Sequence, residues 1–162
     1  MEAGGKLRVY LDTSVVNHLF AYDTPDRKQD TTRLWEECRA GKFEVFASPV
    51  VLYEIGRCEE PKRSWLLEKM RLIEFLTLEE TKEANDLAAD YIRNGVFKER
   101  DFDDCLHVAY AVVSGCDLVI SWNFKHLVND KTRGKVKVVN ATNRYKEIGI
   151  VSPTEFLMGV WK

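Results

Sequence analysis

Short apolar runs alternate along this chain with longer segments in which apolar residues recur at helical spacing. The apolar runs predict strands over residues 7–11, 43–47, 73–76, 118–121 and 136–139. The longer segments predict helices after residue 12, from 25 to 40, from 48 onward, over 62–71, 79–94 and 101–114, and a last short helix from 152. Glycines at positions 41, 95 and 115 follow three of the predicted helix ends, where a glycine commonly stops a helix.

This alternation of strands and helices indicates an α/β protein built on a parallel sheet. Short strands that are apolar almost throughout are typical of parallel sheets that helices cover on both faces. The sequence contains no repeat, low-complexity segment or linker rich in proline and glycine. We therefore expect residues 1–162 to form a single domain around a central parallel sheet of four to five strands.

Composition and charge narrow the class of protein. Hydrophobic residues make up 45% and charged residues 31% of the chain, which is typical of a globular protein. No run approaches the ~20 apolar residues that span a bilayer, and residues 1–6 lack the apolar core of a signal peptide. The four cysteines form no CxxC pair, so we expect reduced thiols rather than a structural zinc site. A cytoplasmic protein without membrane attachment is the expectation.

Acidic residues lie close to the ends of the predicted strands. Asp12 directly follows the first strand, Glu54 lies about one and a half turns into the helix that begins after Ser48, and Asp104 lies near the start of the helix over 101–114. Ligands of parallel sheets bind beyond the carboxyl ends of the strands. Carboxylates gathered there would repel one another, and Mg²⁺ or Mn²⁺ is the usual remedy. The pattern predicts a metal site for phosphate chemistry.

Each acid also has a plainer interpretation when it is taken alone. Asp12 could cap the first helix, and either Asp103 or Asp104 could cap a later one. Glu54 could be a solvated helix residue. The three acids together are harder to explain in this way than any single member.

A basic segment follows the last of the predicted site strands. It holds five cations against one acid, and these cations are Lys125, Lys131, Arg133, Lys135 and Lys137. The formal net charge of −2 argues against a protein that coats nucleic acid through bulk electrostatics, but not against a local basic grip. A solvated loop is the simpler interpretation of this segment, and contact with a nucleic-acid backbone is the functional one.

Four segments resemble the ordered signatures of PIN-domain proteins. They are Leu11-Asp12-Thr13-Ser14-Val15-Val16, Ser48-Pro49-Val50-Val51-Leu52-Tyr53-Glu54-Ile55, Asp104-Cys105-Leu106-His107-Val108-Ala109 and Leu118-Val119-Ile120-Ser121-Trp122-Asn123. Their order and spacing extend over roughly residues 7 to 157. The variant with Ser-Trp-Asn-Phe-Lys-His is similar to bacterial and archaeal PIN proteins that are grouped with VapC-type toxins.

The resemblance implies a three-layer α/β/α fold and Mg²⁺- or Mn²⁺-dependent cleavage of single-stranded RNA, commonly by a homodimer. It also implies a protein antitoxin as a partner. Asp12, Glu54 and Asp104 fall on acidic positions of the family, and Asn123 stands where the family often has a fourth acid. An amide oxygen can still ligate Mg²⁺ or hold its water, but it attracts a second ion less strongly. Asp103 or Asp117 could compensate only in part.

Neighbouring residues are candidates for contact with RNA. Ser14 could orient a metal-bound water or cap a helix, and Ser121 could contact a phosphate. Trp122 could stack on a base, although a place in the core is the simpler expectation. Lys125, Lys131 and Arg133 complete the set of candidate RNA contacts. His107, three residues after Asp104 on an apolar helix, is expected to be a satisfied core histidine.

Three other functions compete with a nuclease. A phospho-aspartate enzyme would want a second acid two residues after Asp12, where the chain has Ser14. Dinucleotide- and P-loop-binding fail because neither GxGxxG nor GxxxxGK[ST] occurs. A PIN-fold protein that binds RNA or a protein partner without cleaving stays open because of Asn123. The prediction is a metal-dependent endoribonuclease with Asp12, Glu54 and Asp104 as ligands and Asn123 as an auxiliary group.

Overall fold

The computed structural model describes residues 5–161, and its centre is a parallel sheet. The sheet has five strands in the described part of the chain: β1 (Arg8–Leu11), β2 (Glu44–Ala47), β3 (Phe75–Thr77), β4 (Leu118–Ile120) and β5 (Gly149–Val151). They lie in the order β3-β2-β1-β4-β5, and every pair is parallel. The predicted parallel sheet of four to five strands is therefore confirmed.

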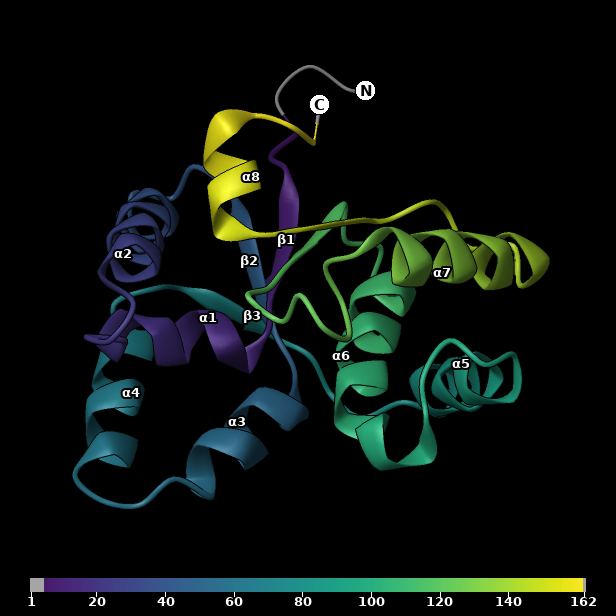
Figure 1. Ribbon diagram of the computed structural model, residues 1–162, viewed down its shortest axis with the longest axis horizontal. Helices are drawn as coiled ribbons and strands as arrows, with labels where there is room; N and C mark the ends of the chain where they lie inside the picture. The colour runs from purple at the N-terminus through teal and green to yellow at the C-terminus, as the bar shows by residue number, and fades with distance from the viewer. Residues whose placement is uncertain (1–4, 162) are drawn as a thin grey trace.

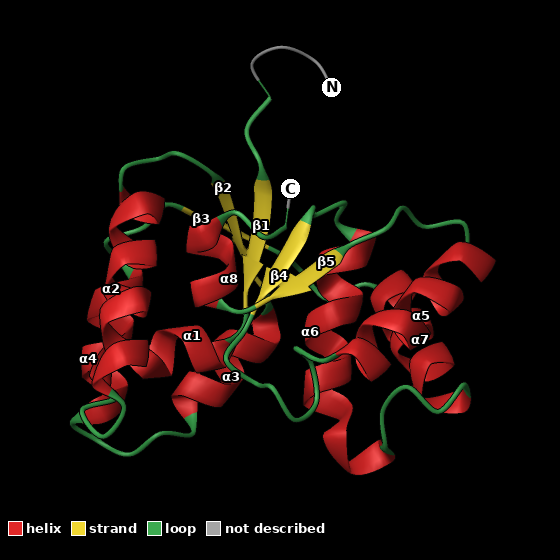
Figure 2. Ribbon diagram, turned by 45° about the horizontal axis from the view of Figure 1, so that its top comes forward, coloured by secondary structure: helices red, strands yellow, loops and turns green. Residues whose placement is uncertain are grey.

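Helices cover both faces of this sheet. The helices are α1 (Thr13–Asn17), α2 (Pro25–Arg39), α3 (Pro49–Gly56), α4 (Lys62–Met70), α5 (Lys82–Arg93), α6 (Phe102–Val113), α7 (Asp130–Thr142) and α8 (Pro153–Met158), with short 3-10 turns η1 (His18–Phe20) and η2 (Glu99–Asp101). Figures 1 and 2 show α1, α2 and α4 on one side of the sheet and α5, α6 and α7 on the other. Helix α8 packs on α2, and α3 contacts both α4 and α6 below the strand ends. The predicted three-layer α/β/α fold is confirmed.

The topology brings two strand ends together at the middle of the sheet. The chain passes from β1 through β2 to β3, and then returns to place β4 on the other side of β1. The switch point therefore lies between β1 and β4, whose residues pair in the register Leu11 with Ile120. Open α/β sheets bind ligands at such a point. Asp12 and Ser121 are the first residues beyond these two strands.

The prediction of a strand over residues 136–139 is wrong, because this segment belongs to helix α7. The Asn129 side chain accepts a hydrogen bond from the Thr132 N–H and caps the helix at its start. The buried residues of α7 are Thr132, Val136, Val139 and Asn140, which is helical spacing, whereas Val138 is exposed. The β-branched residues suggested a strand, but the cap and the spacing decide for a helix. The fifth strand is instead β5, ten residues further on.

Two smaller features complete the fold. The four cysteines are free thiols, three of them buried and Cys58 partly buried. Within residues 5–161, no helix combines the length and the apolar character needed to cross a membrane.

Candidate active site

Two serines hold the Asp12 carboxylate at the switch point. Ser14 donates through its hydroxyl to Asp12 Oδ1 at 2.5 Å, and Ser121 donates to Oδ2 at 2.6 Å. Each hydroxyl also accepts a backbone N–H from the segment after β4: Trp122 N–H bonds to Ser14, and Asn123 N–H bonds to Ser121. Asp12 is only 3% exposed, and it caps α1 through the Ser14 N–H. Asp12 therefore caps α1 and also belongs to the candidate site.

Glu54 is bonded to a buried histidine on helix α6. His107 Nε2 lies 2.6 Å from Glu54 Oε1, and the Thr13 hydroxyl donates to the same oxygen at 2.8 Å. The other ring nitrogen of His107 lies 2.6 Å from the Tyr10 hydroxyl, which in turn contacts Ser48. His107 is buried with both nitrogens paired, as expected of a core histidine. Its partner, however, is a candidate metal ligand, so it also positions the site.

Asp104 belongs to a second group that contains a histidine. His126 Nδ1 lies 2.8 Å from Asp104 Oδ2 and 3.8 Å from Asp101 Oδ1. The ligand atoms of these three residues lie within 4.8 Å of one another, which makes them a group with the spacing of a metal site. The predicted trio Asp12, Glu54 and Asp104 does not form such a close group in the described residues. The two carboxylates and the imidazole fit a divalent cation.

Asn123 supports the turn that carries His126. Its side-chain Oδ1 accepts the His126 N–H at 2.9 Å, and its backbone carbonyl accepts the N–H groups of Leu127 and Val128. An amide oxygen and a carboxylate oxygen can both accept such a bond. The residue at position 123 therefore fixes where the His126 ring stands, next to Asp104.

The pKa values of the site carboxylates are shifted in different directions by their surroundings. Burial raises the pKa of Asp12, against the opposing influence of the His107 charge and the serine hydrogen bonds. Burial also raises the pKa of Asp104, and the Glu54 charge adds to this increase. Burial acts in the same direction on Glu54, but the hydrogen bond from His107 prevails and lowers the pKa of Glu54. The negative charges of Asp12 and Asp104 are thus costly in the protein alone, and a cation would relieve that cost.

His107 responds to the same charges in the opposite sense. Burial alone would lower its pKa, but the hydrogen bond to Glu54 and the charges of Asp12, Glu54 and Asp104 raise it. All three predicted ligands therefore act on one imidazole at the floor of the site. Of the three acids, Glu54 alone is hydrogen-bonded to His107, and Asp12 and Asp104 act on it only through their charges.

The residues predicted to contact RNA differ in how far they are exposed. Ser121 and Trp122 are buried, and the Trp122 indole N–H donates to Thr31 at 2.8 Å. Ser14 is partly buried and bonded to Asp12 as described. Lys125 and Lys131 are exposed.

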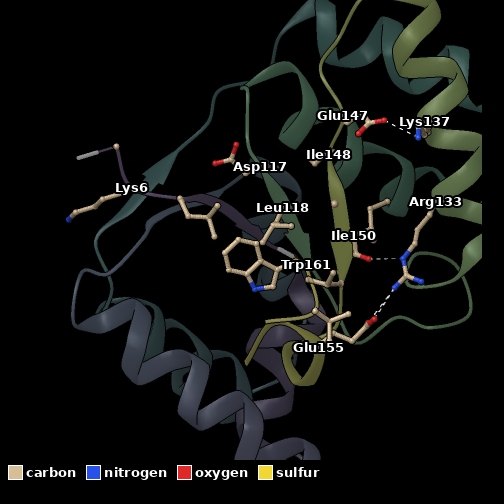
Figure 3. A pocket seen from close by; sticks show the side chains of 15 residues that line it. Lys6, Asp117, Leu118, Arg133, Lys137, Glu147, Ile148, Ile150, Glu155 and Trp161 are labelled. Carbon is tan, nitrogen blue, oxygen red and sulfur yellow. Dashed lines mark hydrogen bonds and ion pairs between the residues drawn. The ribbon is translucent and has the colours of Figure 1, made fainter. Parts of the chain in front are cut away.

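The Arg133 side chain holds α7 against β5 and α8. Its Nε donates to the Ile150 carbonyl at 2.9 Å, and its other nitrogens reach Glu155 and Asp130. It lines a hollow of about 950 Å³ between α7, β5 and the segment after α8, together with Lys137 and Asp117 (Figure 3). None of the proposed ligands Asp12, Glu54 and Asp104 lines this hollow. Most of the basic segment is helical rather than a loop, because α7 begins at Asp130.

Sequence reasoning missed Asp101 and His126 as members of the site. Asp101, Asp104 and His107 are spaced by three residues, which places them along one side of a helical segment, and this spacing was a usable signal. His126 had no comparable signal, because its approach to Asp104 depends on the turn after β4.

The described chain matches the family model of the PIN domain over residues 8–125. The chain belongs to the PIN-domain family. The matched PIN segment contains Asp12, Glu54, Asp104 and Asn123 and ends one residue before His126. Among curated protein sequences, none matches the chain significantly.

Solved structures give the same fold for this PIN domain. A chain in the crystal structure of VapBC2 from Rickettsia felis, bound to a DNA fragment from their promoter, superposes with a TM-score of 0.51. The two sequences are 13% identical, and the alignment covers 89% of this chain and 97% of that one. At this identity the likeness supports the fold, and the chemistry has to be argued from the residues of this PIN domain.

Proposed function

We propose that this PIN-domain protein is a metal-dependent endoribonuclease that cleaves single-stranded RNA. The observation that carries the proposal is the position of Asp12, buried at the switch point with both carboxylate oxygens held by serines. A helix cap uses one carboxylate oxygen, whereas serine hydroxyls here orient both oxygens of Asp12. A divalent cation at these groups would neutralise phosphate charge and lower the pKa of a water molecule.

The residues of the site would either bind the cation or orient its ligands. Asp12, Glu54 and Asp104 are the proposed ligands, and Asp101 and His126 extend the donor set on the side of Asp104. Ser14 and Ser121 keep the Asp12 carboxylate in one orientation, so it need not reorganise when a cation arrives. His107 holds Glu54 in the same way.

The donor set also bears on which cation would bind. Mg²⁺ prefers oxygen ligands throughout, whereas an imidazole nitrogen suits transition metals better. We therefore expect Mn²⁺ to bind more tightly than Mg²⁺, while either ion could support cleavage.

The test is cleavage of a labelled single-stranded RNA by the purified protein with Mn²⁺, Mg²⁺ or EDTA, read together with the melting temperature. A bound cation should raise the melting temperature, because it stabilises only the folded state. Cleavage and a shift with Mn²⁺, both abolished by EDTA, are the expected results. No cleavage of any single-stranded RNA, together with an unchanged melting temperature, would reject the proposal.

A second candidate is a PIN-domain protein that binds RNA or a protein partner without cleaving. The observation that favours it is the side chain of Asn123, which is committed to the His126 N–H and supplies no fourth carboxylate. RNA binding in EDTA without cleavage in Mn²⁺ would select this candidate.

We also propose two protein partners, which are an antitoxin and a second copy of the chain. The fold is that of a chain from VapBC2, a pair of proteins crystallised together on DNA. The chain can be purified alone and together with any small protein that is encoded next to it. Light scattering would then show whether a homodimer or a mixed complex forms.

A further inference from the structure

Two exposed aromatic rings, each with a guanidinium beside it, adjoin the candidate ligands. In helix α3, Tyr53 precedes Glu54 and is 61% exposed, and the Arg57 guanidinium lies 5.5 Å from its ring centroid. After β4, Phe124 follows Asn123 and is 42% exposed, and the Arg27 guanidinium lies 5.2 Å from its ring centroid. Each pair is therefore a neighbour in sequence of a residue in the candidate site.

The two arginines are placed by the fold in different ways. The Arg27 guanidinium also lies 5.3 Å from the centroid of the Trp122 ring, which is itself anchored to Thr31. Arg57 is the C-cap residue of α3 and lies three residues after Glu54, which is the spacing of neighbours on a helix surface. The two guanidinium groups thus lie beside the exposed rings.

The two pairs stand on different helices around the acids. Phe124 and Arg27 join the segment after β4 to the start of α2, whereas Tyr53 lies in α3 and Arg57 directly follows that helix. Both views show α1, which begins at the Asp12 cap, between α2 and α3 (Figures 1 and 2). A single strand bound along α1 would therefore pass from the helix that carries Arg27 to the helix that carries Tyr53.

Exposed rings with cations beside them suit one class of partner in particular. Bases stack on aromatic faces, and guanidinium groups bind phosphate oxygens through paired hydrogen bonds. In a duplex the base faces are already stacked on one another, so only a single strand offers them. A peptide would cover the rings, but phosphates also complement the two guanidinium charges.

We propose that Phe124 with Arg27, and Tyr53 with Arg57, are two stacking platforms that hold unstacked bases of single-stranded RNA on either side of the phosphate at the acids. The inference rests on the proposed nuclease function and specifies how that site selects a single strand. It moves the main RNA contacts from the basic segment of α7, where Arg133 is committed to the fold, to α2 and α3.

The test is binding of a fluorescent single-stranded oligouridylate of about ten nucleotides, a length within the site sizes of single-strand binders. EDTA in the buffer separates binding from cleavage. Tyr53→Leu and Phe124→Leu remove a ring face and keep an apolar side chain. Trp65→Leu is the matched control, because Trp65 is 47% exposed on α4 and stacks on Phe20 rather than lying next to a candidate site residue in sequence. Melting curves confirm that each variant is folded.

Each of Tyr53→Leu and Phe124→Leu should weaken binding about tenfold, and the double variant about a hundredfold, because separate contacts add in free energy. Trp65→Leu should bind as the wild type does. Arg27→Gln and Arg57→Gln should each reduce the slope of log affinity against log salt by about 0.7. The corresponding duplex RNA should bind weakly to all proteins and show no effect of the ring variants.

Wild-type affinity in both ring variants would overturn the inference, and this is also the result expected if the rings serve a protein partner. That result alongside Mn²⁺-dependent cleavage would leave the nuclease proposal intact. Binding that depends on the rings but no cleavage would support the platforms and reject the nuclease. An absence of RNA binding by the wild type would reject the platforms.

Discussion

His126 Nδ1 lies 2.8 Å from Asp104 Oδ2, and this contact joins the turn after β4 to the start of helix α6. Asp101 approaches the same nitrogen at 3.8 Å. The pair brings an imidazole into a site otherwise made of carboxylates, at a distance at which one cation could bind all three side chains.

Replacement of His126 should therefore change both the affinity for metal and the preference among metals. We expect His126→Gln to weaken Mn²⁺ binding at least about tenfold, with a much smaller effect on Mg²⁺, because Mg²⁺ prefers oxygen ligands. Titration calorimetry with each ion measures the change. His18→Gln is the matched control, since the His18 ring bonds to the Ser14 carbonyl rather than to a carboxylate. Equal Mn²⁺ affinity in His126→Gln and the wild type would remove His126 from the metal site.

Gly149 leaves room on β5 for the side chain of Leu118 on β4. A Cβ atom at this position would lie 2.5 Å from Leu118 Cδ2, which is well inside van der Waals contact. We expect Gly149→Ala to lower the free energy of unfolding by about 1–3 kcal/mol, as overpacking of a core typically does. Urea denaturation followed by circular dichroism provides the measurement.

Gly134 offers a control for the same chemical change. It lies in helix α7 with open space around the added Cβ, so Gly134→Ala should raise the free energy of unfolding by about 0.5–1 kcal/mol. A neutral or stabilising effect of Gly149→Ala would show that Leu118 yields without cost.

Asp117 stabilises the start of β4, at the opposite end of the strand from the site. Its carboxylate accepts the Arg8 N–H and a Lys146 hydrogen bond, both at 2.9 Å. Burial acts to raise the pKa of Asp117, but these hydrogen bonds and the nearby cations prevail and lower it. A carboxyl whose folded-state pKa is depressed adds stability above its unfolded pKa, and that stability is lost as the pH falls through the folded pKa.

Asp117→Asn should therefore cost about 1 kcal/mol at pH 7, and the difference from the wild type should shrink as the pH falls below about 4. Chemical denaturation across this pH range provides the measurement. Asp86→Asn, which breaks an exposed pair with Lys82 on α5, should have a smaller effect, because exposed ion pairs contribute little to stability. A difference for Asp117→Asn that persists at low pH would show that its charge is not the cause.

The sequence predicted the fold where local signals and burial agree. Runs such as Val9–Leu11 and Leu118–Ile120 are buried throughout, and they form the paired central strands. The segment 136–139 was misassigned because valine favours strands, whereas the Asn129 cap and packing of one face of α7 determine a helix. The true edge strand is only three residues long and contains Gly149, so it carried little signal.

The candidate site was predictable to the extent that its residues follow strand ends. Asp12 could be placed because the carboxyl end of a central parallel strand is a general binding position. The contacts of His126 could not, because they require the hydrogen bond from its backbone N–H to Asn123 and the geometry of the turn. The serine pair around Asp12 required the pairing of β1 with β4, which a single sequence does not specify.

The central claim, that the Asp12 carboxylate serves metal-dependent cleavage of RNA, is tested most directly by comparing cleavage of single-stranded RNA in Mn²⁺ by the wild type and by Asp12→Asn. The amide is nearly isosteric, although it can accept a hydrogen bond only through its oxygen, and a melting curve without metal confirms that the variant is folded. We expect Asp12→Asn to lose cleavage at least about a hundredfold and to lose the Mn²⁺-induced rise in melting temperature, whereas Asp86→Asn retains both. Equal cleavage by Asp12→Asn and the wild type would contradict the central claim.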